Sequence, residues 1–504
     1  MPRRADEHPD APGRAAVAET HVSTVFFAGD LAVKVKKPVR TGFLDFSTRE
    51  ARRRACEREV ALNRRLSPDV YLGVADVRGP DRRICEHMVV MRRMPAEARL
   101  STLVRQGAQV DVALRRVARA VASFHAAAET SPRIARAGSA RAVLANWCQN
   151  TEQMHRFAGS LLEPALLQGV DAMARRYVAG RGPLFAARIA GGKVRDGHGD
   201  LLADDIYCLD DGPRILDCIE FDDSLRHGDV LADVAFLAMD LERLGAPQHA
   251  SRLLRWYLEY AGETAPASLV DHYVAYRAQV RSKVACLAAE QGDVDAAADA
   301  MRLLRLSAAH LSAARVRLVL VGGLPGSGKS TLSEGIATQR GWMVLRSDEI
   351  RKELAGLDAH ANASAPYGRG LYTARWTATT YREMLSRAER ALRHGESVVL
   401  DASWTDARWR RAAARIATTT AADLVALECQ ASSGIARQRL RDRAIRGPRI
   451  SDATPQIAER MALAAAAWPD AVQIDTTGRA DVALATAIQA VDTEPDVLRF
   501  GLTR

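Results

Sequence analysis

The chain has 504 residues, more than a single hydrophobic core usually organises, so two or three domains are expected. Its hydrophobic content of 48% and charged content of 26% indicate a globular protein. No run approaches the roughly 18 apolar residues of a membrane span, and the basic start lacks the apolar stretch of a secretory signal. We therefore expect a soluble, cytoplasmic protein without a membrane partner.

The net charge of +10 comes from arginine, because only seven of the 71 basic residues are lysines. Scattered arginine is more typical of a solvated surface than of a nucleic-acid groove, although it suits phosphorylated ligands. Lysine carries a compact point charge and arginine a planar one, so in a chain this rich in arginine a lysine indicates a position where the point charge is required. Three of the seven lysines lie in "AVKVKKPV". The seven cysteines form no CxxC pair and are odd in number, which indicates reduced thiols rather than a disulfide framework.

The first part of the chain reads as a small sheet with one helix. We expect a disordered tail over 1–20, and then two strands within 21–40 joined by Ala-Gly-Asp and stopped by a proline. A charged helix follows at 48–66, and "ICEHMVVMRRM" at 84–94 is strand-like. Residues 21–100 are therefore predicted to form the small lobe of an α+β domain.

Residues 101–313 are predicted to be mainly helical, because apolar residues recur there at helical spacing. One acidic stretch interrupts the helices: "HGDLLADDIYCLDDGPRILDCIEF", residues 198–221, reads as a loop and two short strands around the Asp-Asp-Gly turn. Asp210 and Asp211 belong to that turn and are expected to face solvent.

At residue 314 the pattern changes to apolar strands that alternate with helices. Such alternation predicts a parallel sheet with helices on both faces, so residues 314–504 are expected to form an α/β domain. The first strand, Val316 to Val321, feeds the sequence "GGLPGSGKS", which contains G-x-x-x-x-G-K-S. Glycines let backbone N–H groups surround phosphate oxygens, the lysine reaches the β- and γ-phosphates, and the serine hydroxyl ligates Mg²⁺. The helix that follows directs its positive end at the phosphates. The residues predicted to bind nucleotide here are Gly323, Leu324, Pro325, Gly326, Ser327, Gly328, Lys329, Ser330 and Thr331.

Acids and arginines follow the phosphate loop at informative places. Asp348 and Arg351 come just after the next strand, and Asp401 ends a further apolar strand, where an acid can orient magnesium-bound water. The segment "ARQRLRDRAIRGPR" places Arg439, Arg443 and Arg446 on one helical face, as expected of a lid that closes on a transferring phosphate. An exposed helix is the alternative reading of these arginines.

These residues resemble the P-loop kinase group that includes gluconate kinase, polynucleotide kinase and zeta-type toxins, over about residues 316 to 477. The resemblance implies transfer of a γ-phosphoryl group to a hydroxyl. Kinases of this group often carry a D-x-x-R element, which Asp348 and Arg351 match here. Asp348 would activate the acceptor hydroxyl, and Arg351 would help to position the acceptor and the aspartate. Arg443 and Arg446 would act on the transferring phosphate, and Ser330 with Asp401 would hold the metal.

The first half carries a second set of residues in kinase order. Lys34 lies on an early strand, Glu59 in the following helix, and Asp200 in "HGDL". Asp205 comes five residues later, and Glu220 ends the next strand. This order resembles the aminoglycoside phosphotransferase family over about residues 21 to 260, and in particular a branch of uncharacterised proteins that fuse such a half to a P-loop half.

The resemblance implies a role for each of these residues. Lys34 would hold phosphates and pair with Glu59, with Glu57 as the alternative, and Asp200 would be the general base. Asp205 and Glu220 would ligate Mg²⁺, with Asp217 as the alternative to Glu220, while His198 would brace the loop. The family loop usually reads H-G-D-x-x-x-x-N, so Asp205 replaces asparagine and Glu220 replaces aspartate. An acid can still ligate Mg²⁺ through oxygen, and we expect a working but more metal-dependent site.

The leading hypothesis is a cytoplasmic ATP- and Mg²⁺-dependent phosphotransferase with two nucleotide sites that acts on a small hydroxylated molecule. One alternative is a pseudokinase sensor half that regulates a P-loop ATPase. The other is a nucleic-acid-end kinase, which the basic charge favours. No aromatic residues are interleaved with arginine as a stacking platform, so a nucleic-acid partner is not expected.

Overall fold

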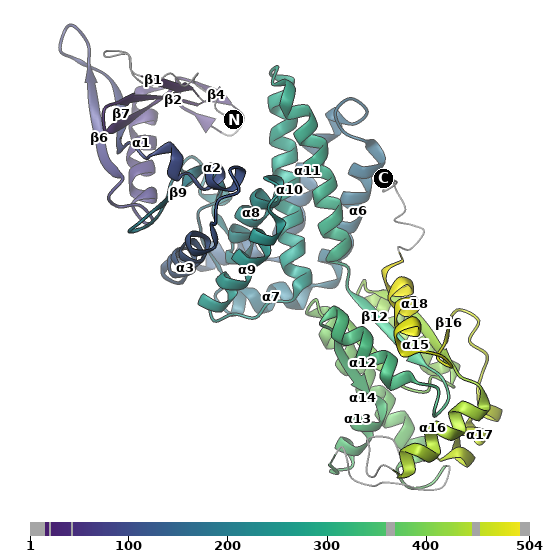
Figure 1. Cartoon of the computed structure of the whole chain (residues 1–504). Coiled ribbons are helices and arrows are strands. Elements are labelled where there is room, and N and C mark those ends of the chain that lie inside the picture. The colour runs from purple at the N-terminus through teal and green to yellow at the C-terminus, as the bar shows by residue number, and fades with distance from the viewer. Residues whose placement is uncertain (1–15, 20–21, 42–43, 359–367, 446–453, 494–504) are drawn as a thin grey trace. The chain divides into compact units, whose positions relative to one another are not determined.

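The computed structural model describes residues 16–19, 22–41, 44–358, 368–445 and 454–493. It divides into two compact units: residues 1–167, 185–265 and 270–310 form the first, and residues 168–184, 266–269 and 311–504 form the second. Both expected fold classes are confirmed, an α+β kinase-like region followed by a P-loop domain with a parallel sheet (Figure 1).

The small lobe of the first unit is an antiparallel sheet in the order β1-β2-β3-β7-β6. Its strands are β1 (Ala16–Glu19), β2 (Ser23–Ala28), β3 (Leu31–Lys36), β6 (Tyr71–Arg78) and β7 (Ile84–Arg92), and a short hairpin of β4 (Arg40–Thr41) and β5 (Leu44–Asp45) follows β3. Residues 1–15 and 20–21 lie outside the described residues, but Ala16–Glu19 pair with β2, so the tail expected over 1–20 includes a strand. Strand β6 was not predicted, because Gly73 breaks its apolar alternation.

Helix α1 (Arg49–Asn63) packs on this sheet and carries a buried acid against it. The Thr48 side chain caps the helix by accepting a hydrogen bond from the Ala51 N–H at 3.2 Å. Glu59 lies on the same helical face as the apolar Cys56 and Val60, which belong to the core of this lobe. Because side chains alternate along a strand, Lys34 and Lys36 share one face of β3. That face meets Glu59, so the sheet and the helix together create a charged site in an apolar lobe.

The rest of the first unit is helical, with two small antiparallel strand pairs around the acidic stretch. One is the hairpin of β9 (Ile206–Leu209) and β10 (Gly212–Ile215), joined by the predicted Asp210-Asp211 turn. The other pairs β8 (Val194–Asp196), before the acidic stretch, with β11 (His227–Asp229), after it. The helices begin with α2 (Leu100–Arg105), α3 (Asp111–Ala127), α4 (Pro132–Ala135) and α5 (Ala140–Met154). Next come α6 (Pro164–Gly180) and α7 (Gly182–Ala190), of which residues 168–184 belong to the second unit. They continue with α8 (Val230–Arg243), α9 (Pro247–Tyr260), α10 (Ala267–Glu290) and α11 (Val294–Ala313).

The second unit is a five-stranded parallel sheet in the order β13-β14-β12-β15-β16. The strands are β12 (Arg317–Gly322), β13 (Met343–Arg346), β14 (Val398–Asp401), β15 (Asp423–Gln430) and β16 (Val472–Asp475). Helices α12 (Lys329–Arg340) and α18 (Ala480–Asp492) pack on one face, and α14 (Ala374–Arg393) and α15 (Ala407–Thr419) on the other (Figure 1). The remaining helices are α13 (Ser347–Leu354), α16 (Ser433–Ile445) and α17 (Pro455–Ala464).

The second unit also includes two segments that the sequence placed in the first half, residues 168–184 and 266–269. Arg176 forms an ion pair with Asp423 at 2.8 Å, and Arg181 donates to the Thr420 carbonyl at 2.5 Å. A chain divided at residue 314 would lose both contacts, so the experiments below use the whole chain. Within the described residues, no helix is long and apolar enough to cross a membrane.

Candidate functional sites

Asp233, in the buried helix α8, anchors the backbone of the acidic loop of the first unit by hydrogen bonds. The Asp233 carboxylate accepts hydrogen bonds from the backbone N–H groups of His198, at 2.7 Å, and Gly199, at 2.9 Å. His125 lies 3.0 Å from the same carboxylate and contacts the Tyr257 hydroxyl at 2.9 Å. Burial favours the neutral acid, but the hydrogen bond and charge of His125 outweigh it, so the pKa of Asp233 lies well below its ordinary value. An ionised Asp233 therefore fixes the backbone immediately before Asp200.

The loop geometry also depends on Gly199 and on the predicted brace. Gly199 has φ of 90°, and a Cβ there would meet Ile219, Leu225 and Arg226 at 3.1–3.2 Å. The His198 ring contacts the Leu216 carbonyl at 3.1 Å, which confirms that this histidine braces the loop. A second acid in α8, Asp240, accepts from the Ala203 N–H at 3.0 Å and thereby orients the turn before Asp205.

The predicted ion pair between Lys34 and Glu59 is present, with 3.0 Å between the ammonium and the carboxylate. Glu57, the alternative, is half exposed and pairs with Arg53 instead. The second oxygen of Glu59 bonds Lys36 at 2.6 Å, so one fully buried carboxylate joins both lysines of β3. Burial disfavours the charged Lys34, but Asp217 and Glu59 overcome it and raise the pKa of Lys34 well above its ordinary value.

The two candidate acids after β10 have different partners. Asp217 binds Lys34 at 2.6 Å, and this charge first of all lowers the pKa of Asp217. Glu220 binds Lys36, and burial raises the pKa of Glu220. The charge of Asp217 also contributes to raising the pKa of Asp205. Together with its ion pair to Lys34, this favours Asp217, the alternative, as the acid that shares the site with Asp205, whereas Glu220 pairs with the buried Lys36.

The two acids of the loop are both shifted toward the neutral form. Burial raises the pKa of Asp200 to about 6, with Arg281 opposing and Asp217 adding to the shift. Burial, Asp217 and Asp200 raise the pKa of Asp205 well above its ordinary value. A carboxyl with a pKa near 6 is suited to general-base work near neutral pH. In the described residues no three acids, histidines or cysteines gather closely enough to hold a metal by themselves. Mg²⁺ would therefore need water or phosphate oxygens as further ligands, and protein-bound Mg²⁺ usually has such ligands.

The phosphate loop of the second unit lies at the carboxyl end of the central strand β12. Gly323 and Gly326 have φ of 129° and 82°, and a Cβ at either would come within 2.6 Å of a backbone carbonyl. Lys329 begins α12 and donates to the Leu324 carbonyl at 3.0 Å across the loop. The parallel register sets Asp401 beside Val321, so the acid lies at the start of the loop.

Asp401 and Ser330 meet as the metal prediction requires. Burial raises the pKa of Asp401, while the Lys329 charge and a hydrogen bond with the Ser330 side chain oppose the rise. A hydroxyl and a carboxylate at the mouth of a phosphate loop are suitable oxygen donors for Mg²⁺. Asp348 pairs with Arg351 at 2.5 Å on α13, and the buried Arg351 guanidinium lies 4.6 Å from the centre of the Tyr372 ring. The predicted D-x-x-R pair is therefore formed and anchored.

The expected arginine lid is described only in part. Arg439 donates to the Thr476 carbonyl at 2.7 Å and to the Gly326 carbonyl at 3.5 Å, so it contacts the phosphate loop. Arg446 lies outside the described residues, as does the side chain of Arg443. Thr476, whose hydroxyl donates to the Ser327 carbonyl at 2.5 Å, was missed by sequence reasoning because it lies far along the chain.

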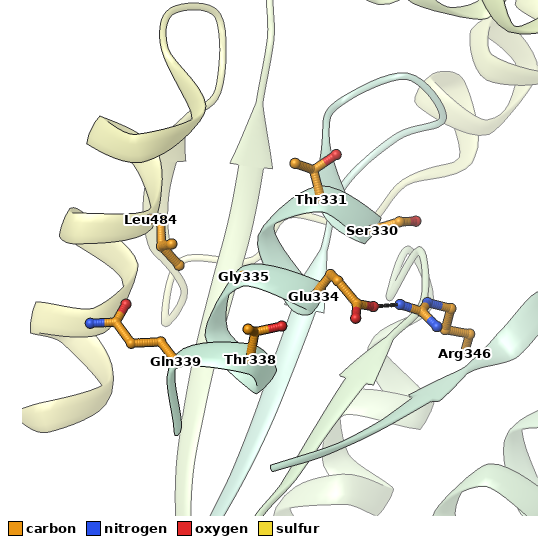
Figure 2. A pocket seen from close by; sticks show the side chains of 8 residues that line it. All are labelled: Ser330, Thr331, Glu334, Gly335, Thr338, Gln339, Arg346 and Leu484. Carbon is orange, nitrogen blue, oxygen red and sulfur yellow. Dashed lines mark hydrogen bonds and ion pairs between the residues drawn. The ribbon is translucent and has the colours of Figure 1, made fainter. Parts of the chain in front are cut away.

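A hollow of about 790 Å³ runs along α12 and reaches Ser330, the predicted metal donor, at one end (Figure 2). Ser330 and Thr331 lie at that end, and Leu484 of α18 lines the hollow farther along. Glu334 and Arg346 form an ion pair at its side. The lining contains no other residue of the phosphate loop, so the phosphate cradle lies beside this hollow rather than inside it.

Comparison with known proteins agrees with this division of the chain. Residues 28–269 match the model of the Phosphotransferase enzyme family, and residues 318–467 match the AAA domain. The fold and the sites thus define a kinase-type phosphotransferase region joined to a P-loop kinase domain. Uncharacterized proteins of Mycobacterium bovis and Mycobacterium tuberculosis are 42% identical over 462 residues, 92% of this chain and 92% of theirs. The chain belongs to the family of these mycobacterial proteins.

Solved structures resemble the two regions separately. A choline/ethanolamine kinase family protein from Mesorhizobium loti is 17% identical, with a TM-score of 0.38, over 60% of this chain and 92% of its own. A gluconokinase from Sinorhizobium meliloti is 17% identical, with a TM-score of 0.24, over 35% of this chain and 91% of its own.

Proposed function

We propose that this protein transfers the γ-phosphoryl group of ATP to a hydroxyl of a small molecule, with one nucleotide site in each unit. The observation that carries the proposal is the position of Lys34, which bonds both Glu59, at 3.0 Å, and Asp217, at 2.6 Å. A lysine oriented by a buried acid can hold nucleotide phosphates, and the neighbouring Asp200 and Asp205 supply the base and a metal ligand.

The division of labour in the first site follows from the environment of each acid. Asp200, with its pKa raised to about 6 by burial, is ionised near neutral pH and can accept the proton of the acceptor hydroxyl. Asp205 and Asp217 would hold Mg²⁺, with Glu220 as the acid that fixes Lys36. When bound, Mg²⁺ would neutralise phosphate charge during transfer. When nucleotide binds, the Lys34 ammonium would exchange its ion pair with Asp217 for contacts with the phosphate oxygens, and Asp217 would then be available to the metal.

The second site supports the same chemistry with different parts. Lys329 and the backbone N–H groups of the loop would bind phosphates, with Ser330 and Asp401 as the metal donors. Asp348, which pairs with Arg351, is not one of the proposed metal donors and would activate the acceptor. The acceptor class is small hydroxylated molecules, because no stacking platform for a polynucleotide accompanies the arginines.

The test is a transfer assay on the whole chain with labelled ATP and a panel of sugars, aminoglycosides, small hydroxy acids and 5′-hydroxyl oligonucleotides. We expect transfer by the wild type, transfer confined to one site in Asp200→Asn or Lys329→Ala, and none in the double variant. Asp210→Asn and Lys37→Ala, which change the same residue types outside the sites, serve as controls. Transfer that persists in the double variant contradicts the proposal. Nucleotide binding without any transfer would instead favour the pseudokinase sensor, and transfer only to oligonucleotides would favour the end kinase.

A further inference from the structure

Helix α10 contacts the acidic loop on the side of the proposed base. Arg277 donates to the Ala232 carbonyl at 2.8 Å and to the Gly199 carbonyl at 3.3 Å, and its guanidinium lies 4.6 Å from the centre of the Phe236 ring. Gly199 directly precedes Asp200. One face of α10 is therefore fixed against the backbone that carries the base.

Arg281 lies four residues after Arg277, hence on the same face of α10 and one turn farther along. Of the surrounding charges, Arg281 has the strongest influence on Asp200, and Arg277 also contributes. Yet Arg281 forms no ion pair with Asp200, and within the described residues no hydrogen bond or ion pair of its side chain is found. A half-buried guanidinium on the face of α10 that contacts the acidic loop thus retains its donors for another group.

The other charges that act on Asp200 are already matched. Asp217 is neutralised by Lys34 at 2.6 Å, and Asp240 by Arg243 at 2.7 Å. Arg277 donates through Nε and Nη1 to two backbone carbonyls. Arg281 is therefore the cation of this group that lacks a partner in the described part of the chain. Partial burial reduces screening by water, so the unpaired guanidinium of Arg281 would attract an anionic ligand more strongly than an exposed arginine would.

We propose that Arg281 binds a carboxylate or phosphate group of the phosphoryl acceptor, so that the first site takes an acidic hydroxyl compound. This inference rests on the proposed function. A guanidinium offers a planar fork of donors that matches either anion. With the anion held by Arg281, the acceptor hydroxyl faces Asp200. Its oxygen attacks the γ-phosphorus, the bond from that phosphorus to the β-phosphate oxygen of the departing ADP breaks, and the hydroxyl proton passes to Asp200.

The test compares three probes that differ in one group: glycerol, glycerate and glycerol 3-phosphate. Each is titrated calorimetrically into the whole chain carrying Lys329→Ala, saturated with Mg²⁺ and a non-hydrolysable ATP analogue. We expect glycerate or glycerol 3-phosphate to bind at least about tenfold more tightly than glycerol, and Arg281→Gln to remove that advantage. The stronger of the two anions identifies the group as carboxylate or phosphate. Arg281→Lys should restore part of the affinity, and Arg305→Gln, an exposed arginine on α11, should change nothing.

Two results overturn the inference while leaving the proposed function intact: equal affinity for all three probes, or anion binding that Arg281→Gln leaves unchanged. Failure of the Lys329→Ala chain to bind the ATP analogue has a different meaning. It would contradict a nucleotide site in the first unit, and with it both proposals.

Discussion

The Tyr71 hydroxyl accepts a hydrogen bond from the backbone N–H of Asp217 at 3.2 Å, and Asp217 has a positive φ of 63°. This left-handed backbone conformation costs a non-glycine residue about 1–3 kcal/mol and persists only where its surroundings impose it. Tyr71 is buried, so packing fixes the position of its hydroxyl, and the hydroxyl in turn fixes the Asp217 backbone beside Lys34. A strained residue supported in this way, at the point where metal and phosphates would meet, is consistent with a functional position.

Tyr71→Phe should therefore weaken the first site as well as the fold. The partly buried Asp217 N–H loses its partner, which costs about 0.5–1.5 kcal/mol, the net worth of a typical hydrogen bond, and the carboxylate loses its fixed position. We expect a lower free energy of unfolding in urea and a higher Mg²⁺ concentration for half-maximal nucleotide binding. Tyr260→Phe, which removes a hydroxyl bonded to the exposed Arg115, is the control. Unchanged Mg²⁺ dependence would show that Tyr71 does not position Asp217.

The pH dependence of transfer at the first site should follow the ionisation of Asp200. Because burial raises the pKa of Asp200 to about 6, the base is ionised above that pH and protonated below it. In the Lys329→Ala chain, kcat/KM should rise with pH through an apparent pKa near 6 and then level off. Asp200→Asn should lower transfer by about 10²-fold or more and abolish this limb. A limb that persists in Asp200→Asn would assign the base to another group.

Asp205→Asn tests the acid that replaces the family's asparagine. When metal is bound and Asp205 is ionised, the substitution removes a negative charge whose repulsion of phosphate is on the order of 1–4 kcal/mol when partly screened. We expect nucleotide binding to be kept and the Mg²⁺ needed for half-maximal occupancy to fall severalfold, measured by titration in the Lys329→Ala chain. Asp210→Asn in the hairpin turn is the matched control. If Asp205→Asn raises the Mg²⁺ requirement instead, Asp205 contributes more as a ligand than it costs in repulsion.

Asp348 should act on the acceptor of the second site and not on ATP. Its partner is Arg351, at 2.5 Å, whereas Asp401 is the acid that meets Ser330. Asp348→Asn in an Asp200→Asn chain should leave ATP affinity nearly unchanged while transfer falls by about 10²-fold or more. Calorimetry and the transfer assay are read together, with the exposed Asp470→Asn as the control. An equal loss of ATP affinity would make Asp348 a nucleotide or metal ligand.

Because of His310, the free energy of unfolding should fall as the pH rises into the alkaline range. It lies between Asp271, at 2.8 Å, and Glu242, at 2.9 Å. Burial disfavours its charge, but hydrogen bonds to the two acids prevail and raise the pKa of His310 to about 9. The folded pKa is above the unfolded one, so the stabilisation is complete below about pH 6.5 and is lost as pH rises through 9. At about 1.4 kcal/mol per pKa unit it is on the order of 3 kcal/mol.

The measurement is urea unfolding at pH 6 and at pH 9.5. The wild type should lose stability between these values by clearly more than His310→Gln does. Equal losses in both chains would contradict a charged His310 in the folded protein.

Much of each site could be predicted because its residues lie in one local motif, at the end of a recognisable strand, or in a recognisable order along the chain. The phosphate loop from Gly323 to Ser330 is a local backbone structure that glycine spacing dictates. Asp401 was found because the ends of parallel strands meet at one edge of a sheet. The order Lys34, Glu59, Asp200 indicated a kinase-like half before any contact was visible.

Apart from His198, the residues that hold the loop were not assigned, although a signal existed for one of them. Asp233 is a lone acid in the apolar run "VLADVAFLAM", and a buried acid of that kind needs donors. Which donors it finds depends on packing: the His198 and Gly199 amides are 34 and more residues away. The same is true of Tyr71, which lies in a strand that the sequence analysis did not predict.

The sequence by itself determined the two fold classes, the phosphate loop and the order of the kinase-like residues, because local periodicity and glycine placement encode them. Only the tertiary structure decided which acid meets which lysine. Asp217 reaches Lys34, and Glu220 reaches Lys36, through contacts that span more than 180 residues of chain. It also left Arg281, on the face of α10 that contacts the acidic loop, without a partner in the described part of the chain. Burial and charge pairing depend on distance in space, which spacing along the chain does not specify.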